Sequence, residues 1–540
     1  MQTVPGFRGA WRTDVAARAA YAEGAGIYRI LPAAVAVPSD TDDLIALVRW
    51  AGSTGTPLVP RGAGSGMAGG NVGPGVVVDL TRGFRTPCTV EPAARRVRCG
   101  AGVTWREIDQ AARAQRLFLP PDPASGAFCT IGGMVATNAA GARSYKYGSV
   151  RGWVEALEYV TADGEVGRAD RADLRTPRTA VERRLLSDLA PYLRQHQRPI
   201  EASAPRTRKN SSGYCLVAPD NGWVRHLLIG SEGTLGFVTT VELALEPIPA
   251  HDTTVLVPVR SLDELPDVLA ALRDADPVAV ELLDRTYLEF ARAADDRIPA
   301  DAEAVVLARL AGETEPSLPG DAEKRAVFAE GPAVAEELWN LRHLASPILA
   351  RLPDERRSLQ VIEDGCVPLD RLPAYIAGLR KLAAEYGYQV VIFGHAGDGH
   401  VHANLLVDTQ AADLAARLGE FLRQVTNMQL ALGGTTSGEH GDGRLRAPFL
   451  ERLYGATYVE ACKRVKAAFD PNGILNPGVK LAIGPSFTGD TLKVGHEAPV
   501  LPPDVAQRLR DVERTAAWST FRLDLVSERQ SSDAALSSIT

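Results

Sequence analysis

The chain has 540 residues, too many for one ordinary hydrophobic core, and this length predicts roughly two to four domains. Apolar residues make up 45% of the chain and charged residues 23%, a composition typical of a globular protein. The net charge is −7 and the basic residues are spread along the chain, which argues against a nucleic-acid-binding surface and against a polybasic membrane surface.

Cysteine usage and hydropathy bear on the compartment. None of the six cysteines forms a CxxC pair, which argues against an iron–sulfur cluster, a zinc ribbon or a disulfide framework. We expect free thiols in a reducing compartment. Residues 1–20 lack the continuous apolar core of a secretory signal, and no apolar run approaches the length of a membrane span. The expectation is therefore a cytoplasmic protein, with attachment to the periphery of the inner membrane left open.

The first half of the chain is predicted to contain short strands, glycine-rich turns and a few helices. Residues 34–60 predict a strand, a helix with its N-cap at Ser39 or Thr41, and a second strand. The sequence LEYVTADGEV at 157–166 predicts a hairpin that turns at Asp163-Gly164. The run HLLIGSEGTLGFVTTVELAL at 226–245 predicts two strands around a further glycine-rich turn.

From about residue 249 the predicted strands alternate with amphipathic helices. Strands are expected at TTVLVPV, AVELLD, AVVLARL, QVIEDGCVP and YQVVIFGH, and helices at SLDELPDVLAALRDA, LDRLPAYIAGLRKLAAEYG and AADLAARLGEFLRQVTNMQLAL. This alternation predicts a separate α+β domain with an antiparallel sheet. Beyond Pro477 the chain becomes proline-rich and polar, with one short helix expected at 505–518 and disorder at 527–540.

A glycine-rich loop, RGAGSGMAGGNVGPG, places seven glycines between Arg61 and Gly75. Successive backbone N–H groups in such a loop can form a concave site for an anion such as phosphate. The loop is not the dinucleotide-binding fingerprint of an ordinary Rossmann unit, because no helix follows it directly. For this loop alone, a flexible surface turn is the better-supported interpretation.

Two further segments, PPDPASGAFCTIGGMVATNAAGARSYKYGSV and IGSEGTLGFVTTVEL, follow in order. Together the three segments resemble the FAD-binding domain of the vanillyl-alcohol oxidase superfamily, also called the PCMH type. The resemblance implies a bound FAD. It also implies that the link to FAD is non-covalent, because Ser65 stands where some members carry the histidine that attaches the flavin. The flavin-contacting residues that it implies are Arg61, Gly62, Ala63, Gly64, Ser65, Gly66, Gly69, Gly70, Pro121, Asp122, Ser125, Thr130, Gly132, Gly133, Asn138, Glu232, Gly236 and Val238.

A histidine cluster occupies GHAGDGHVHANL at 394–405. His395 and His402 flank a turn between two predicted strands, and a hairpin brings its arms together, so both rings can converge on one point. Further on, Glu439 and His440 are adjacent in GEHG. Two imidazoles and a carboxylate can hold a divalent metal ion, with zinc or manganese as candidates. The alternative is that each histidine is an ordinary core or loop residue.

The motifs HxGDGxxHxN, GEHG and KAAFDPNGILNPG resemble a narrower group, the FAD-linked oxidases that include D-lactate dehydrogenase, D-2-hydroxyglutarate dehydrogenase and the glycolate oxidase flavoprotein subunit. The resemblance runs from about Tyr21 to Lys480. It implies oxidation of a D-2-hydroxy acid to the 2-oxo acid, with hydride transfer to the flavin. The residues that it implies are His395, His402 and Glu439 as metal ligands, His440 as base, Arg342 and Asn404 beside the substrate, and Asn476 near the flavin.

Two departures from this group leave alternatives open. His400 stands where the group usually has asparagine, and it could join the metal shell or tune it, because it faces the same side of the strand as His402. Ile362 stands where relatives acting on the five-carbon diacid carry a lysine, which favours D-lactate. D-2-hydroxyglutarate and glycolate stay as alternatives, as do a non-catalytic flavin-binding subunit and a metal hydrolase built on the histidine cluster.

The resemblance also bears on partners and domains. The expected partners are a small 2-hydroxy acid and an electron acceptor, which could be a cytochrome, an electron-transfer flavoprotein or a quinone. A homodimer is compatible with the sequence. The expected fold is α+β, with a two-subdomain PCMH-type FAD-binding domain followed by an α+β cap domain with an antiparallel sheet. The expected boundaries are an N-terminal arm at 1–28, the FAD-binding domain at 29–248, the C-terminal oxidase domain at 249–480 and a partly disordered tail at 481–540.

Overall fold

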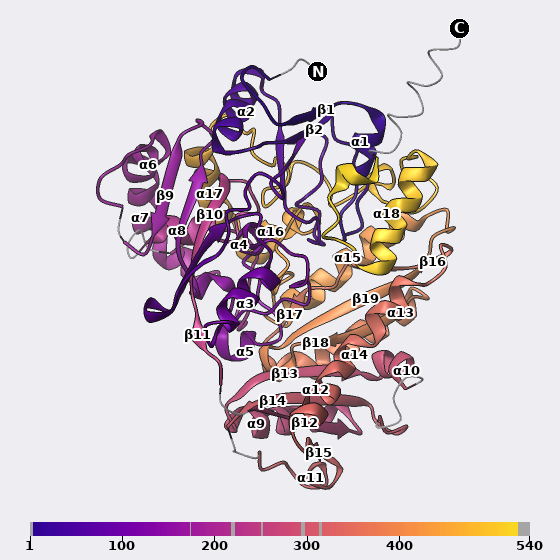
Figure 1. Ribbon diagram of the computed structural model, residues 1–540. Coiled ribbons are helices and arrows are strands. Elements are labelled where there is room, and N and C mark those ends of the chain that lie inside the picture. The colour runs from indigo at the N-terminus through magenta and orange to yellow at the C-terminus, as the bar shows by residue number, and fades with distance from the viewer. Residues whose placement is uncertain are drawn as a thin grey trace.

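Two larger sheets form the N-terminal half of the computed structural model, and a third forms its lower half (Figure 1). A small two-stranded sheet pairs β7 (Leu117–Phe118) with β11 (Glu246–Pro247). The structure describes residues 4–172, 174–217, 222–249, 252–292, 298–312 and 316–526. The disorder expected at 527–540 therefore lies outside the described residues. Within the described residues, no helix combines the length and the apolar character that crossing a membrane requires.

The first sheet has four strands among the described residues, in the order β1 (Ala10–Arg12), β2 (Ala34–Val37), β4 (Val76–Asp79) and β3 (Leu58–Arg61). Helix α2 (Thr41–Thr54) connects β2 to β3. Its N-cap is Asp40, whose side chain accepts a hydrogen bond from the Asp43 N–H, so the prediction of Ser39 or Thr41 was wrong by one residue. Strand β1 and helix α1 (Val15–Ala20) lie in the expected N-terminal arm, which therefore contributes to this sheet.

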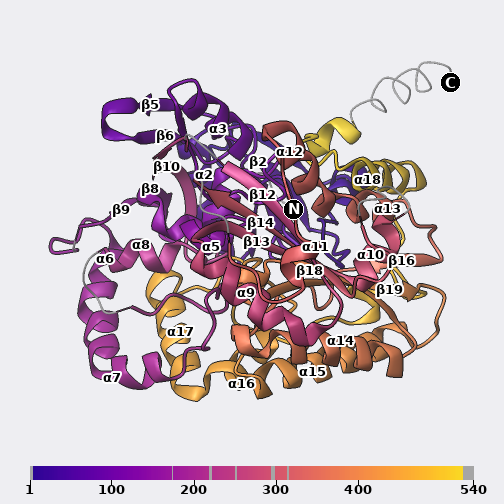
Figure 2. The same cartoon turned by 90° about the horizontal axis from the view of Figure 1, so that it is seen from below.

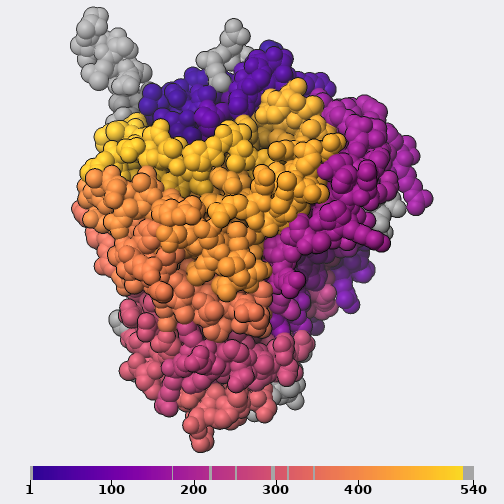
Figure 3. Space-filling model, turned by 180° about the vertical axis from the view of Figure 1, so that it is seen from behind, coloured from indigo at the N-terminus to yellow at the C-terminus, as the bar shows by residue number. Residues whose placement is uncertain are grey.

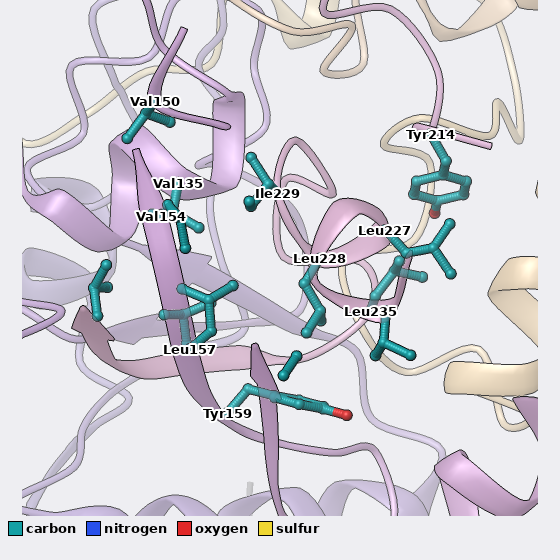
Figure 4. Close-up of a cluster of buried hydrophobic side chains, with 14 of the residues drawn as sticks. Val135, Val150, Val154, Leu157, Tyr159, Tyr214, Leu227, Leu228, Ile229 and Leu235 are labelled. Carbon is teal, nitrogen blue, oxygen red and sulfur yellow. The ribbon is translucent and has the colours of Figure 1, made fainter. Parts of the chain in front are cut away.

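The second sheet is antiparallel, in the order β5 (Thr89–Glu91), β6 (Arg96–Gly100), β10 (Phe237–Ala244), β8 (Val154–Val160) and β9 (Val166–Asp170). The predicted hairpin is confirmed, since β8 pairs with β9 and Gly164 in the turn has a φ of +70°. Side chains of β8 pack against helix α4 (Ile131–Thr137) and helix α8 (Trp223–Leu228), as Figure 4 shows for Leu157, Val135 and Leu228.

Helix α8 corrects the prediction of a strand that begins at His226. Five of its six residues are buried, Arg225 among them, because the Arg225 guanidinium donates to the backbone carbonyls of Arg151 and Val154. Polar residues of this helix are therefore not set apart on an exposed face, and the run has no periodicity that separates a helix from a strand.

The third sheet is antiparallel, as predicted, with strands in the order β15 (Val327–Phe328), β12 (Asp252–Val259), β14 (Ala304–Ala311), β13 (Pro277–Asp284), β18 (Gln389–Gly394), β19 (His400–Asp408) and β16 (Arg356–Leu359). Strand β17 (Gly365–Cys366) also pairs with β19. Every residue of β13 is buried, because helices cover both faces of the sheet.

The helices divide between the two faces of this sheet (Figure 2). Helices α9 (Leu265–Asp274), α14 (Leu372–Glu385) and α15 (Leu414–Ala431) share one apolar cluster with the sheet. Helices α10 (Arg285–Ala291), α12 (Pro332–Asn340) and α13 (Ala345–Ala350) lie on the other face.

The chain then returns to the N-terminal half through α16 (Leu450–Tyr454) and α17 (Ala456–Phe469). The Asn476 N–H donates to the Leu58 carbonyl of β3 at 2.8 Å. Helix α18 (Pro503–Thr515) packs against α1, and the C-terminal residues form a band between the N-terminal residues and the third sheet (Figure 3).

Candidate functional site

One cavity of about 720 Å³ lies between the two halves. One wall comes from the glycine loop at 61–70 and from the segments 123–141 and 231–238. The opposite wall includes Arg342, His395, His402, Asn404, Glu439 and His440. The glycine segments and the histidine cluster, which are far apart in the sequence, therefore face the same space.

The glycine-rich wall depends on residues without a Cβ atom, because an added side chain would clash with its neighbours. A Cβ on Gly62 would lie 2.4 Å from the Thr130 hydroxyl, and Gly64 has a φ of +79°, which residues with side chains rarely adopt. A Cβ on Gly70 would lie 3.0 Å from a carboxylate oxygen of Glu232. Backbone atoms thus form much of this wall, and the volume of about 720 Å³ and the glycine-rich lining fit a large cofactor such as FAD.

Most of the predicted flavin-contacting residues line the cavity. They are Arg61, Gly62, Ala63, Gly64, Ser65, Gly66, Gly70, Ser125, Thr130, Gly132, Gly133, Glu232, Gly236 and Val238. Cys129 also lines it, but burial raises the pKa of its thiol to about 11, so it stays protonated and unreactive at neutral pH.

The other predicted residues lie behind the wall: Gly69, Pro121, Asp122, Asn138 and Asn476. The Asn476 side chain donates to the Gly70 carbonyl at 2.8 Å and to the Glu232 carbonyl at 2.9 Å, which ties the first glycine segment to the third. Asn138 ends α4 in the left-handed conformation. These residues hold the wall in place, and the structure does not put them in contact with the cavity.

The histidine cluster is built on the hairpin of β18 and β19, in which Phe393 pairs with His402. The Nε2 atoms of His395 and His402 lie 3.3 Å apart. Glu439 Oε1 is 3.2 Å from the first and 3.5 Å from the second. Donor atoms bound tetrahedrally to one ion at about 2.0–2.1 Å would be separated by about this much. The donor set and its spacing therefore fit a divalent cation.

The second atom of each donor group is already engaged. His395 Nδ1 lies 2.5 Å from Glu281 Oε1, and His402 Nδ1 lies 2.9 Å from the Glu363 carbonyl. Glu439 Oε2 accepts hydrogen bonds from Lys209 Nζ at 2.7 Å and from the Gly141 N–H at 2.9 Å. Such outer contacts orient the ligands of metal sites, so three lone pairs are left to converge.

His400 lies beneath this cluster and has no free ring nitrogen. Its Nε2 is 2.9 Å from Asp364 Oδ1, and its Nδ1 is 3.3 Å from Lys209 Nζ. The His400 ring is fully buried, and His400 is not one of the described residues that line the cavity. Burial and the Lys209 charge lower the pKa of His400, which keeps the ring neutral. His400 also belongs with His395, His402 and Glu439 to a group whose donor atoms all lie within 4.8 Å of one another, so metal ligation and a tuning role both stay open.

His440 stacks on His402, with ring centroids 5.1 Å apart and an angle of 10° between the planes. Its backbone N–H donates to Asp364 Oδ2 at 2.9 Å, and its Nδ1 is 3.3 Å from Glu363 Oε1. Burial lowers the pKa of His440, but the carboxylates of Asp364, Glu363 and Glu439 outweigh it and raise the pKa to about 9. A cation at the neighbouring donors opposes that rise.

Arg342 lies on the 3₁₀ turn Leu341–His343, directly after α12. Its Nε donates to Glu281 Oε2 at 3.1 Å, and its guanidinium stacks on the Trp339 ring at 5.2 Å. Glu281 therefore links Arg342 to His395. Asn404 lies two residues beyond His402 on β19 and lines the same cavity.

The sequence interpretation missed the charged residues behind the cluster: Lys209, Glu281, Glu363, Asp364 and Arg446. Asp364 accepts hydrogen bonds from the Ser437 hydroxyl and from the Glu439 and His440 N–H groups. Arg446 Nη2 donates to Glu363 Oε1 at 2.5 Å. The adjacent acidic pair in VIEDGCVP was the available signal, because such a pair in an otherwise apolar segment needs buried partners. The strand predicted at QVIEDGCVP is shorter in the structure, where only Gly365 and Cys366 form β17 and the acidic pair lies in the turn before it.

Ile362 does not bear on substrate size in the way that the sequence suggested. Its side chain is 4% exposed and packs in the apolar cluster of the third sheet. From this segment, Gln360 and Glu363 line the cavity. The structure therefore removes Ile362 as a ground for a short substrate, since an ungapped comparison cannot tell which way a side chain points, and substrate size stays a prediction.

Comparison with known families agrees with this two-walled cavity. The model of the FAD binding domain matches residues 32–170, and the model of the FAD linked oxidases, C-terminal domain, matches residues 248–479. Glycolate oxidase subunit GlcD of Bacillus subtilis is 30% identical over 472 residues, covering 84% of this chain and 90% of the relative. D-lactate dehydrogenase of Archaeoglobus fulgidus is 30% identical over 465 residues, covering 82% and 90%.

D-2-hydroxyglutarate dehydrogenase of Pseudomonas putida is 30% identical over 518 residues, covering 88% of this chain but half of that relative. A solved structure of alkyldihydroxyacetonephosphate synthase shares the fold, with a TM-score of 0.59 and 17% identity over 86% of this chain and 82% of that one. The chain therefore belongs to the PCMH-type FAD-linked oxidases, whose FAD-binding and C-terminal domains it carries in that order.

Proposed function

We propose that this protein oxidises a D-2-hydroxy acid to the 2-oxo acid, with D-lactate, the substrate named in one of the relatives, as the first candidate to test. One observation carries the proposal. The same cavity is lined on one side by the flavin-type glycine segments and on the other by three convergent donor atoms and a stacked histidine. FAD bound along the glycine segments would accept the hydride from the substrate C2. A zinc or manganese ion held by His395, His402 and Glu439 would polarise the substrate hydroxyl.

His440 is the proposed base. Its Nδ1 faces the Glu363 carboxylate, which favours the tautomer with the proton on Nδ1. The lone pair is then on Nε2, which lies 3.7 Å from Glu439 Oε1 and therefore on the side of the donor atoms. A hydroxyl oxygen placed beside those donors can transfer its proton to Nε2.

Arg342 and Asn404 are the proposed substrate-binding residues. Glu281 holds the Nε edge of the Arg342 guanidinium, so its outer nitrogens can donate to a carboxylate. Asn404 projects from the strand that carries His402 and can bind the carboxylate or hydroxyl of the substrate. The two residues together would fix which face of C2 is turned toward the flavin.

A substrate screen with an artificial dye as acceptor tests the proposal. We expect D-lactate to be oxidised faster than L-lactate, because a carboxylate site, a base and a flavin at fixed positions select one enantiomer, and a relative is named for the D form. Glycolate and D-2-hydroxyglutarate are parallel arms, since relatives carry those names. Chelator treatment should remove turnover, and added zinc or manganese should restore it. Full activity in a metal-free protein would refute the metal site, and turnover of none of the four acids would refute the substrate class.

The electron acceptor and the location complete the proposal. A cytochrome, an electron-transfer flavoprotein or a quinone would reoxidise the flavin in the cytoplasm or at the membrane surface. Replacing the dye by each acceptor in the same assay distinguishes these cases.

A further inference from the structure

The C-terminal segment 503–526 lies beyond the residues that the family models match, which end at residue 479. It consists of α18 and a 3₁₀ turn at Arg522–Leu525. Its apolar side chains share a core cluster with α1 and the first sheet, and its band position is visible in Figures 1 and 3. The members of the segment in this cluster are Val505, Leu509, Leu523 and Val526.

The same segment reaches the cavity. Helix α18 ends at Thr515, and the chain turns at its C-cap Ala516, which has a φ of +54°. Glu513, Arg514, Thr515, Ala516 and Trp518 line the cavity together with the glycine loop. The segment is therefore part of the cavity wall and not only a surface attachment.

Arg522 is the unexplained residue of this segment. It is 3% exposed, and its three guanidinium nitrogens are buried with no hydrogen-bond partner among the described residues. The guanidinium lies 5.3 Å from the centre of the Trp518 ring, and Trp518 lines the cavity. A buried charge without a partner is costly, so a native chain is expected to have a use for it.

The acidic groups near Arg522 are already paired with other residues, so the positive charge of Arg522 is not compensated. Its charged neighbours are Arg61, Asp79 and Glu23. Asp79 already accepts hydrogen bonds from the Tyr21 hydroxyl and from Thr81, and Glu23 is paired with Arg29 at 2.6 Å. Arg61, at the start of the glycine loop, is itself fully buried and donates to backbone carbonyls. Burial and the Arg61 charge lower the pKa of Arg522 to about 9.

We propose that Arg522 supplies counter-charge for the phosphate groups of FAD bound at the glycine loop, so that the C-terminal segment is part of the cofactor site. The glycine loop is the anion-binding part of this wall, and FAD carries two phosphates. Arg522 stands behind Trp518 and Arg61 and acts through its electric field, which the low dielectric of the interior leaves strong. Arg522 is therefore a positioning residue, and the inference rests on the flavin but not on the metal or the substrate.

The test measures cofactor affinity, not turnover. Apoprotein carrying Arg522→Met should bind FAD about tenfold more weakly than the unchanged chain, because one nearby cation is lost. Riboflavin, which lacks phosphates, should bind equally to both. Arg522→Lys should recover most of the FAD affinity, since it keeps the charge. Flavin fluorescence reports each affinity.

Arg82→Met is the matched control. Arg82 pairs with Asp524 and stacks on Phe521 of the same segment, but at the surface. It should leave FAD affinity unchanged. If Arg522→Met does not fold, the FAD and riboflavin affinities are measured on Arg522→Gln, which is also neutral. Equal FAD affinity in the neutral variant and the unchanged chain would overturn the proposal, and so would parallel losses for FAD and riboflavin, which would indicate a structural role alone.

Discussion

The two walls of the cavity are made in different ways. The flavin-side wall consists largely of backbone, and its shape depends on glycines such as Gly62 and Gly64 that leave room for a ligand. The opposite wall consists of charged side chains, each oriented by a second charged or polar group. The first wall is thus sensitive to added atoms, and the second is sensitive to lost charge.

This difference predicts that flavin binding and metal binding can be lost independently of each other. A Cβ in the glycine loop should weaken flavin binding and leave metal binding intact. A neutralised charge behind the histidine cluster should do the reverse, because removing one partner of a buried pair leaves an uncompensated charge. Only residues that touch both the substrate and the cluster should abolish turnover while both cofactors stay bound.

His440→Ala is expected to have the largest effect on turnover. Loss of the base should lower kcat by about 10²–10⁴-fold, since general-base catalysis contributes on this scale. The flavin spectrum should be unchanged, because His440 lies on the opposite wall. His196→Ala is the control, because His196 stacks on Tyr192 and does not line the cavity. Full activity of the His440 variant would show that another group takes the proton.

Lys209→Met should act mainly on the metal. Lys209 belongs to the flavin-binding half but holds Glu439 Oε2 at 2.7 Å, so its loss frees a metal ligand to rotate. Removing such an outer partner typically costs about 10–100-fold in metal affinity. Metal content and chelator titration measure this, with FAD retention as the internal reference. Lys146→Met, which breaks a surface pair with Asp276, should change neither. Unchanged metal affinity would contradict the role given to Lys209.

Gly64→Ala should act mainly on the flavin. Gly64 has a φ of +79°, and an added Cβ would lie 2.4 Å from an Arg61 nitrogen. Backbone strain of this kind costs about 1–3 kcal/mol. We therefore expect the affinity for FAD to fall by about tenfold or more. Metal content should not change. Gly419→Ala is the control, because a Cβ there meets nothing within 4 Å on helix α15. Loss of metal in the Gly64 variant would show that the two walls are coupled.

The sequence predicted the flavin-side wall well, because its determinants are local. Glycine spacing and neighbouring residues specify a loop, and most residues expected to contact FAD line the cavity. The exceptions include Asn476, which does not line the cavity but donates a hydrogen bond to the Gly70 carbonyl of its wall. On the other wall, His395, His402 and Glu439 were found because their motifs are local too.

The supporting charges could not be predicted in the same way. Lys209 and Glu439 are 230 positions apart, and Glu281 and His395 are 114 apart, so no local pattern pairs them. Side-chain direction was equally inaccessible, as Ile362 shows by facing the core. The strand predicted at His226 failed for a third reason, because helix α8 buries Arg225 along with its apolar residues, so the order of polar and apolar residues does not reveal its period.

Glu513→Gln should have the smallest effect on turnover and on cofactor binding, and its main effect should be on stability. Glu513 of α18 accepts hydrogen bonds from Arg357 at 2.7 Å and from Lys493 at 3.1 Å, which joins the C-terminal segment to β16. Burial raises the pKa of Glu513, but Lys493 and Arg357 outweigh it and lower the pKa to about 2. Because the pKa is about 4.3 in an unfolded chain, the carboxylate contributes up to about 3 kcal/mol above pH 5 and loses this as the pH falls toward 2. Urea unfolding should therefore show the variant to be less stable at pH 7, with a gap that narrows at pH 3.5. A gap of equal size at both pH values would mean that Glu513 stabilises the protein through its packing and not through its charge.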